Sequence, residues 1–268
     1  MHNISTTSSF IGFDQEYDTS PVVLVGIPFD GTTSFRPGTR FAPTVVRPDS
    51  YGLETYSPYL DLDMEDYNLC DLGDIELPFG NTTKALKTIY KTFDQIIKDG
   101  KRPLTIGGEH LVSLPIIEAF SKIYPDLCII HFDAHTDLRE DYMGEPLSHA
   151  SVIRRAWDIL GDNHIFQFGI RSGTKVEFDW AKSHTYLQPF NLDSLEEIII
   201  QLQNHPVYIT IDLDVLDPSI FPGTGTPEPG GIDFNTLIFA IKQFTKLNHI
   251  VGADVVELSP HYDISGVS

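Results

Sequence analysis

The sequence predicts an α/β protein built around a mainly parallel β-sheet. Short apolar runs, typical of buried strands, alternate along the chain with longer amphipathic runs that have helical spacing. The short runs do not alternate cleanly between polar and apolar residues, which is typical of parallel strands covered on both faces. Alternation of strands and helices implies right-handed crossovers, which place successive strands parallel in one sheet.

The individual elements follow from these runs. The run over residues 82–98 has its apolar residues at helical spacing and ends before Gly100, a common helix terminator. Ser194 and Asp233 are expected to be helix N-caps. The predicted strands are residues 22–27, 67–72, 103–106, 127–132, 164–168, 185–188, 207–213 and 249–256. The predicted helices are residues 82–98, 113–124, 149–160, 195–204 and 234–247.

The domain organisation is expected to be simple. Residues 1–20 are polar and rich in serine and threonine, which predicts a loose N-terminal arm. Residues 21–268 contain no internal repeat and no linker, so we expect one domain there. Cys70 and Cys128 lie within apolar runs and are expected to be small buried residues.

The charge of the chain limits the partners. With 18 Lys and Arg against 38 Asp and Glu, the net charge is −20. This balance disfavours nucleic acid and anionic membranes, because both bind basic surfaces. An acidic protein attracts small cations instead, although solubility alone would also explain the charge. The sequence has no apolar run long enough to span a membrane and no signal peptide, so the cytoplasm is expected.

Three predicted strands end in side chains that can bind metal ions. The strands over 127–132 and 207–213 lead into Asp and His at alternate positions, and the strand over 103–106 leads into a Gly-Gly turn followed by a histidine. Because the carboxyl ends of parallel strands meet at one edge, these side chains are expected to converge. The candidate ligands are His110, Asp133, His135, Asp137, Asp212 and Asp214.

Electrostatics favours cations at this edge. A single aspartate after a strand is more simply a solvated turn residue, but the set contains four carboxylates. At a separation of ~4 Å and an effective dielectric of about 20, each pair repels by roughly 4 kcal/mol. Arg139 alone cannot balance this charge, whereas two divalent ions can. Oxygen and imidazole ligands without thiolates favour manganese, while nickel, cobalt and iron remain alternatives.

Six motifs together carry a family resemblance. They are residues 107–110 (GGEH), 133–137 (DAHTD), 148–151 (SHAS), 212–218 (DLDVLDP), 223–227 (GTGTP) and 254–260 (DVVELSP). On these motifs the chain resembles the ureohydrolase family, which includes arginase and agmatinase, from Val22 onward. The segments over residues 26–30 and 34–40 look more like those of agmatinase than those of arginase.

The resemblance implies both the fold and the roles of the site residues. The fold would be an arginase-like, three-layer α/β/α sandwich with an eight-stranded, mainly parallel sheet. The six candidate ligands would hold two Mn²⁺ ions, which generate the hydroxide that attacks a guanidinium carbon. Glu257 would bind the guanidinium, His149 would shuttle protons, Asp137 would stabilise the intermediate, and the loop with Thr226 would edge the pocket. From the residues alone, Glu257 could be an ordinary strand-end carboxylate and His149 a helix-start residue.

The stretch over residues 138–149 is expected to select the substrate. Arginase-like proteins carry small hydroxyl and amide side chains here, whereas this chain offers Glu140 and Asp141, which would repel a carboxylate and favour a distal ammonium. We therefore expect agmatine, cleaved to putrescine and urea in polyamine biosynthesis. Arg139 opposes this choice, since it could receive an acid such as guanidinobutyrate; a guanidinobutyrase or an arginase is thus the alternative. A metal-dependent deacetylase and a catalytically inactive metal-binding assembly partner are alternatives of other classes.

Two further expectations concern residues outside the ligand set and the assembly. His131 is expected to be a hydrogen-bonded core histidine, because it lies deeper in its strand than Asp133. Family members normally continue into a further C-terminal helix after a point near Ser268, so that helix is expected to be absent or trimmed. The resemblance also implies a homo-oligomer, either a trimer or a hexamer.

Overall fold

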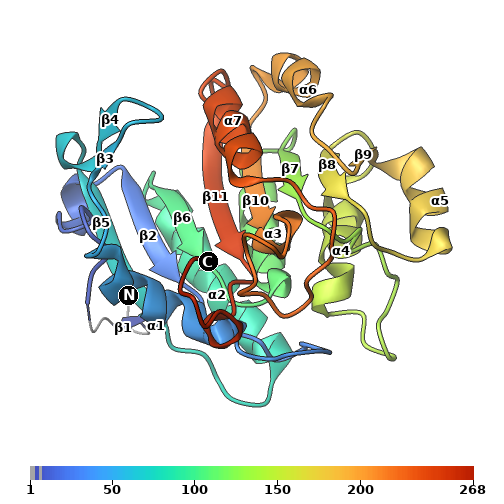
Figure 1. Cartoon of the computed structure of the whole chain (residues 1–268), viewed down its shortest axis with the longest axis horizontal. Coiled ribbons are helices and arrows are strands. Elements are labelled where there is room, and N and C mark those ends of the chain that lie inside the picture. Colours follow the sequence, from blue (N-terminus) through green and yellow to red (C-terminus); the bar gives the residue numbers. More distant parts are fainter. Residues whose placement is uncertain (1–3, 6–7) are drawn as a thin grey trace.

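A nine-stranded, mainly parallel sheet forms the centre of the molecule (Figure 1). The computed structural model describes residues 4–5 and 8–268. The strand order is β1-β5-β2-β6-β11-β10-β7-β8-β9, and within this sheet only β1 runs antiparallel to its neighbour among the described residues. The strands are β1 (Ile4–Ser5), β2 (Val22–Gly26), β5 (Leu69–Ile75), β6 (Arg102–Ile106), β7 (Cys128–Phe132), β8 (Ile165–Ile170), β9 (Tyr186–Pro189), β10 (Val207–Asp212) and β11 (Ile250–Val256). A separate hairpin consists of β3 (Tyr56–Ser57) and β4 (Leu62–Asp63).

All eight predicted strands are present in the sheet and run parallel. The ninth strand, β1, lies in the segment that was expected to be a loose arm. Ile4 pairs with Ile75, and Phe13 of the same segment is buried, so the described part of residues 1–20 is held against the sheet. A two-residue strand has no periodicity that a sequence pattern could reveal.

The described residues form seven α-helices: α1 (Ala42–Ser50), α2 (Thr82–Lys98), α3 (Ser113–Ser121), α4 (Val152–Leu160), α5 (Lys175–His184), α6 (Leu195–Leu202) and α7 (Phe234–Phe244). The five predicted helices are all present, whereas α1 and α5 were not predicted. Helix α1 contains Pro43 and Pro48; Pro43 lies in the first turn, where proline costs no hydrogen bond. Helix α5 begins at a capping box formed by Thr174 and Glu177.

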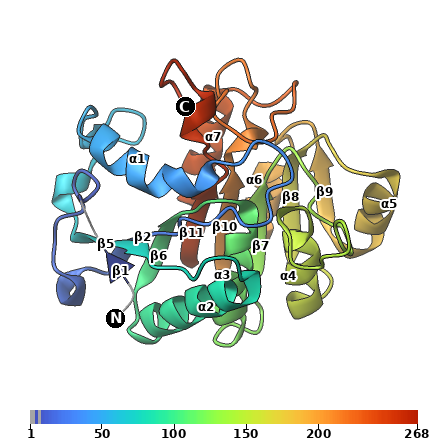
Figure 2. The same ribbon diagram turned by 90° about the horizontal axis from the view of Figure 1, so that it is seen from below.

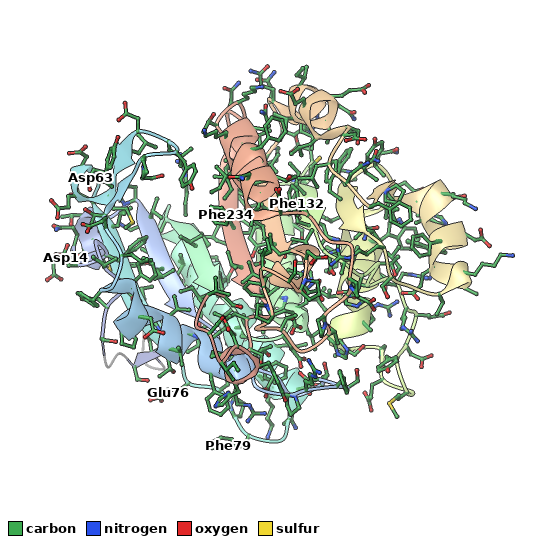
Figure 3. All side chains as sticks on the ribbon, in the orientation of Figure 1. Asp14, Asp63, Glu76, Phe79, Phe132 and Phe234 are labelled. Carbon is green, nitrogen blue, oxygen red and sulfur yellow. The ribbon has the colours of Figure 1, made fainter. Side chains whose placement is uncertain are left out.

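Helices cover both faces of the sheet. Helices α2, α3 and α4 lie on one face, and α6 and α7 lie on the other (Figure 2). Each interface is a separate apolar core, and in one of them Phe132, marked in Figure 3, stacks on Phe168 and meets Phe244 of α7 edge to face. The predicted three-layer α/β/α class is therefore confirmed. Among the described residues, no helix combines the length and apolar character needed to cross a membrane.

Candidate metal centre and active site

The candidate ligands converge where β6, β7 and β10 end, near the middle of the sheet. His110 begins the turn after β6, and its Nδ1 faces three carboxylates. The distances from this nitrogen are 3.1 Å to Asp133 Oδ2, 3.3 Å to Asp137 Oδ2 and 3.4 Å to Asp212 Oδ2. One imidazole nitrogen therefore points into a ring of oxygens that come from two neighbouring strands.

A second group forms around His135. Its Nδ1 lies 2.9 Å from Asp214 Oδ2 and 3.4 Å from Asp133 Oδ1. Asp133 therefore faces both groups, one with each carboxylate oxygen. The groups Asp133–His135–Asp214 and His110–His131–Asp133 each bring three ligand atoms close enough to hold a metal ion.

Local backbone hydrogen bonds orient these carboxylates. Asp212 Oδ1 accepts a hydrogen bond from the Asp214 N–H at 2.9 Å, and Asp133 Oδ1 accepts one from the His135 N–H at 2.5 Å. Asp214 Oδ1 accepts one from the Ala134 N–H at 3.0 Å, which ties the end of β10 to the end of β7. The acids are thus held in place by the turns that end β7 and β10.

Burial and the two neighbouring histidines set the protonation of the carboxylate cluster. Burial, together with neighbouring Asp133, raises the pKa of Asp137 to about 7. Burial has the largest effect on Asp212, and together with the negative charges of Asp214 and Asp133 it raises the pKa of Asp212 well above its usual value. Burial alone would lower the pKa of His110, but hydrogen bonds to the surrounding carboxylates raise it well above normal. Within the described part of the chain, no lysine or arginine pairs with these carboxylates, so divalent cations fit the donor set.

Glu257 and His149 border a cavity of about 250 Å³ that opens above the cluster. Glu257 follows β11, and its Oε1 accepts a hydrogen bond from the His110 N–H at 2.8 Å. Burial, reinforced by Glu109, raises the pKa of Glu257 well above its usual value. Thr226 also lines the cavity and donates a hydrogen bond to Asp214 Oδ2 at 3.2 Å. The three residues predicted beside the ligands are therefore together at one opening.

His149 is held by a chain of contacts that begins at Glu109. The buried carboxylate of Glu109 accepts two hydrogen bonds from Thr32, one from the backbone N–H at 2.9 Å and one from the side-chain hydroxyl at 2.5 Å. The Thr32 hydroxyl oxygen accepts a hydrogen bond from the His149 N–H at 3.1 Å, and Ser34 Oγ lies 3.2 Å from His149 Nε2. Burial lowers the pKa of His149, which favours the neutral ring. Glu109 lies between Gly108 and the candidate ligand His110 and was not predicted to have a role.

Two predicted substrate residues lie elsewhere. Glu140 and Asp141 are exposed and are not among the residues that line the cavity. The loop turns outward at this point, where Asp141 Oδ1 accepts a hydrogen bond from the Gly144 N–H at 3.0 Å. Arg139 and Tyr142 line the cavity instead. Neighbours along an irregular loop can face opposite directions, and composition alone does not show which do.

Glu177 is an acidic residue of the cavity wall that the sequence did not indicate. It lies in α5, a helix that was not predicted, and it is buried. Its carboxylate accepts hydrogen bonds from the Thr136 hydroxyl at 2.7 Å and the Thr174 hydroxyl at 2.7 Å, and it lies 3.8 Å from Arg139 Nε. The capping box formed by Thr174 and Glu177 was the sequence pattern that could have revealed helix α5, and with it Glu177.

A family model of arginases, described as the Arginase family, matches residues 20–268. The chain belongs to the arginase family. It is 50% identical to the agmatinase of Bacillus subtilis (strain 168) over 259 residues, which are 96% of this chain and 89% of that protein. It is 51% identical to the agmatinase of Bacillus anthracis over the same shares of the two chains. A solved structure from Clostridium difficile, provisionally described as an agmatinase, superimposes with a TM-score of 0.93 at 55% identity, covering 94% of this chain and 93% of that one.

These comparisons confirm the resemblance to the ureohydrolases and the arginase-like fold. They also confirm that the protein is an enzyme of the ureohydrolase class. The six ligand assignments and the roles of Glu257, His149 and Thr226 stay predictions, which the geometry above now makes specific.

Proposed function

We propose that this protein hydrolyses agmatine to putrescine and urea at a binuclear manganese centre. The observation that carries the proposal is the convergence of two histidines and four carboxylates beneath one cavity. Relatives at about half identity that are named agmatinases support the choice of reaction.

The residues present fit two divalent ions. One ion would be held around His110 Nδ1, with Asp137 and Asp212, and the other around His135 Nδ1, with Asp214. Asp133 would serve both, since each of its oxygens faces one group. Two ions balance four carboxylates, and a site of oxygen and imidazole donors suits manganese. When bound, such a pair supplies hydroxide near neutral pH for attack on the guanidinium carbon.

The remaining residues of the cavity would bind and orient the substrate. Glu257 offers a carboxylate edge to the planar donors of a guanidinium, a pairing that favours two parallel hydrogen bonds. Asp137 reaches the same opening and would accept a hydrogen bond at the reacting atoms. His149, whose neutral ring also lines the cavity, would first take up a proton from solvent and then pass it to the departing amine.

Charge around the cavity supports a cationic substrate. Arg139 was the residue that argued for a carboxylate-bearing substrate, and it does line the cavity. However, its guanidinium lies over the Tyr142 ring at 4.8 Å from the centroid, and its Nε lies 3.8 Å from Glu177 Oε2. Its charge is thus already partly balanced, while the chain as a whole carries −20. Agmatine has an ammonium and no carboxylate, so it suits this setting better than arginine does.

Guanidinobutyrate is the second candidate, because Arg139 remains at the cavity wall. The test is urea release by manganese-loaded protein, with agmatine, arginine and guanidinobutyrate supplied separately at equal concentration. We expect urea from agmatine at a rate at least ~10²-fold above either of the others. The carboxylate of arginine or guanidinobutyrate would find Arg139 already beside Glu177 and would lack a cationic partner. Urea mainly from guanidinobutyrate would reassign the substrate and make Arg139 its carboxylate partner. Urea from none of them would overturn the proposal.

A further inference from the structure

A row of buried polar side chains crosses the sheet directly beneath the candidate metal centre. Strand register places Thr105, Asp254, Thr210, His131 and Gln167 side by side on β6, β11, β10, β7 and β8. All five residues have no exposed surface. Parallel strands covered on both faces are normally apolar, so five polar residues in register require an explanation. We call them the polar row.

The row lies one layer below the ligands. Thr210 precedes Asp212 by two positions on β10, so these two side chains point to the same face. His131 lies on β7, two residues before Asp133, which follows the end of that strand, and His131 Nε2 lies 2.8 Å from Asp133 Oδ2. The polar row therefore contacts the ligand layer from inside the protein, on the side away from the cavity.

The hydrogen bonds of Gln167 determine which nitrogen of His131 carries the proton. Gln167 Oε1 accepts a hydrogen bond from the Thr185 hydroxyl at 3.0 Å, and Nε2 donates one to the Thr136 carbonyl at 2.8 Å. The opposite amide orientation would place two acceptors together, so the second hydrogen of Nε2 points to His131 Nδ1 at 3.2 Å. That nitrogen is an acceptor. The ring proton must then lie on Nε2, which donates to Asp133 Oδ2 at 2.8 Å.

Thr210 fixes the position of the ring proton of His110 in a similar way. The Thr210 hydroxyl donates to Asp254 Oδ1 at 2.6 Å, and the Tyr208 hydroxyl donates to the other oxygen of Asp254 at 2.5 Å. A threonine hydroxyl has one hydrogen, so Thr210 can only accept from His110 Nε2, which lies 2.9 Å away. The proton of neutral His110 is therefore on Nε2, and the lone pair of Nδ1 faces the carboxylates.

We propose that the polar row assigns opposite roles to two neighbouring histidines: His110 binds metal through Nδ1, and His131 is a positioning residue that donates to Asp133. Distance alone would not show which of the two histidines binds metal. Their ring centroids lie 5.1 Å apart, and both offer a nitrogen close enough to Asp133 for all three residues to share a metal ion. The inference rests on the metal binding proposed above. Partners of this kind tune metal affinity by orienting the ligands.

The first test replaces His131 in two ways and measures manganese affinity by titration of chelator-treated protein. In His131→Gln the side-chain amide can still donate to Asp133, whereas in His131→Leu no donor remains. We expect His131→Gln to stay within about threefold of the wild-type affinity and His131→Leu to lose about 10- to 100-fold. An equal loss in both would mean that His131 is itself a ligand, and no loss in either would mean that Asp133 needs no donor. Either result overturns the proposal.

A second pair of variants tests the other half of the row. Thr210→Ser keeps the hydroxyl, and Thr210→Val keeps the shape without it. We expect only Thr210→Val to weaken manganese binding, again by about 10- to 100-fold. Equal affinities for the two variants would remove the role assigned to Thr210.

Nitrogen NMR of the wild-type histidines provides a readout that does not depend on any variant being folded. The proton of His131 is expected on Nε2, and a protonated Nδ1 would contradict the inference. Because none of these measurements uses substrate, failure of the polar-row proposal is distinguishable from failure of the proposed agmatine hydrolysis, which urea release reports.

Discussion

Asp137 and Glu257, which both line the cavity, have backbone φ angles of 51° and 66°. Non-glycine residues in this left-handed region cost about 1–3 kcal/mol each and persist where the surroundings impose them, commonly at functional sites. Asp133, His135 and Asp137 occupy alternate positions in the sequence, and alternate residues of an extended chain share a face. In the structure β7 ends at Phe132, and a turn brings these side chains together instead. The convergence was predicted correctly, but by a pattern that the chain does not follow beyond its strand.

His149 provides the prediction at the residue scale. We expect His149→Asn to retain both metal ions, because His149 contacts Ser34 and Thr32 rather than the carboxylate cluster. Turnover should fall by about 10²-fold or more, the usual contribution of a positioned proton donor. Metal content and urea release measured on the same sample check this. His184→Asn is the matched control, since His184 is partly buried, hydrogen-bonds Asp162 and lies outside the cavity. Loss of metal from His149→Asn would contradict the shuttle assignment.

At the scale of elements, long periodic runs were predicted well and short or irregular ones were not. Helix α2 spans residues 82–98 as predicted, because its apolar residues recur on one face. Helix α4 begins three residues later than predicted, since His149–Ser151 form a separate 3-10 turn that orients His149 toward the cavity. Helix α5 and strand β1 were missed because packing against the sheet, rather than their own periodicity, stabilises them.

The two predicted N-caps differ in the structure and give a matched pair of variants. Asp233 accepts a hydrogen bond from the Thr236 N–H at 2.7 Å, whereas Ser194 makes no cap bond and donates to Gln188 instead. We expect Asp233→Ala to lower the free energy of unfolding by about 1 kcal/mol through loss of the cap. Ser194→Ala should cost less than this, and urea release should be unchanged in both. Denaturant unfolding measures the difference; equal losses would mean that the cap bond is not the stabilising feature.

The whole molecule places a concentrated negative charge at its centre. The candidate ligands lie at the ends of β6, β10 and β7, which are inner strands of the sheet, and the polar row lies beneath them. Acidic side chains also lie at the outer edge, where Asp14, Asp63 and Glu76 are marked in Figure 3. Folding therefore brings together carboxylates that repel one another, and a bound cation that offsets this repulsion should stabilise the folded state.

Removal of metal tests this at the scale of the molecule. We expect chelation to lower the unfolding temperature of the wild-type protein. Readdition of Mn²⁺ at 100 times its dissociation constant should restore about 2.7 kcal/mol, if the ion binds only the folded state. Asp214→Asn is the control, because loss of this carboxylate should abolish both the metal response and urea release. A wild-type unfolding temperature that is the same with and without chelator would refute metal-linked stability.

The sequence by itself determined the parallel α/β architecture and the residues that could form a metal centre. Both depend on short-range patterns, and the rule that parallel strands end at one edge then brings distant motifs together. Only the tertiary structure decided which acids face the cavity, so that Glu177 lines it while Glu140 and Asp141 do not.

The tertiary structure likewise separated His110 from His131, because that distinction depends on partners on other strands. Gln167 and Thr210 lie beside His131 only through strand register, and register is a property of the assembled sheet. Hydrogen-bond direction is decided by distances between residues far apart in the sequence, which no local pattern contains.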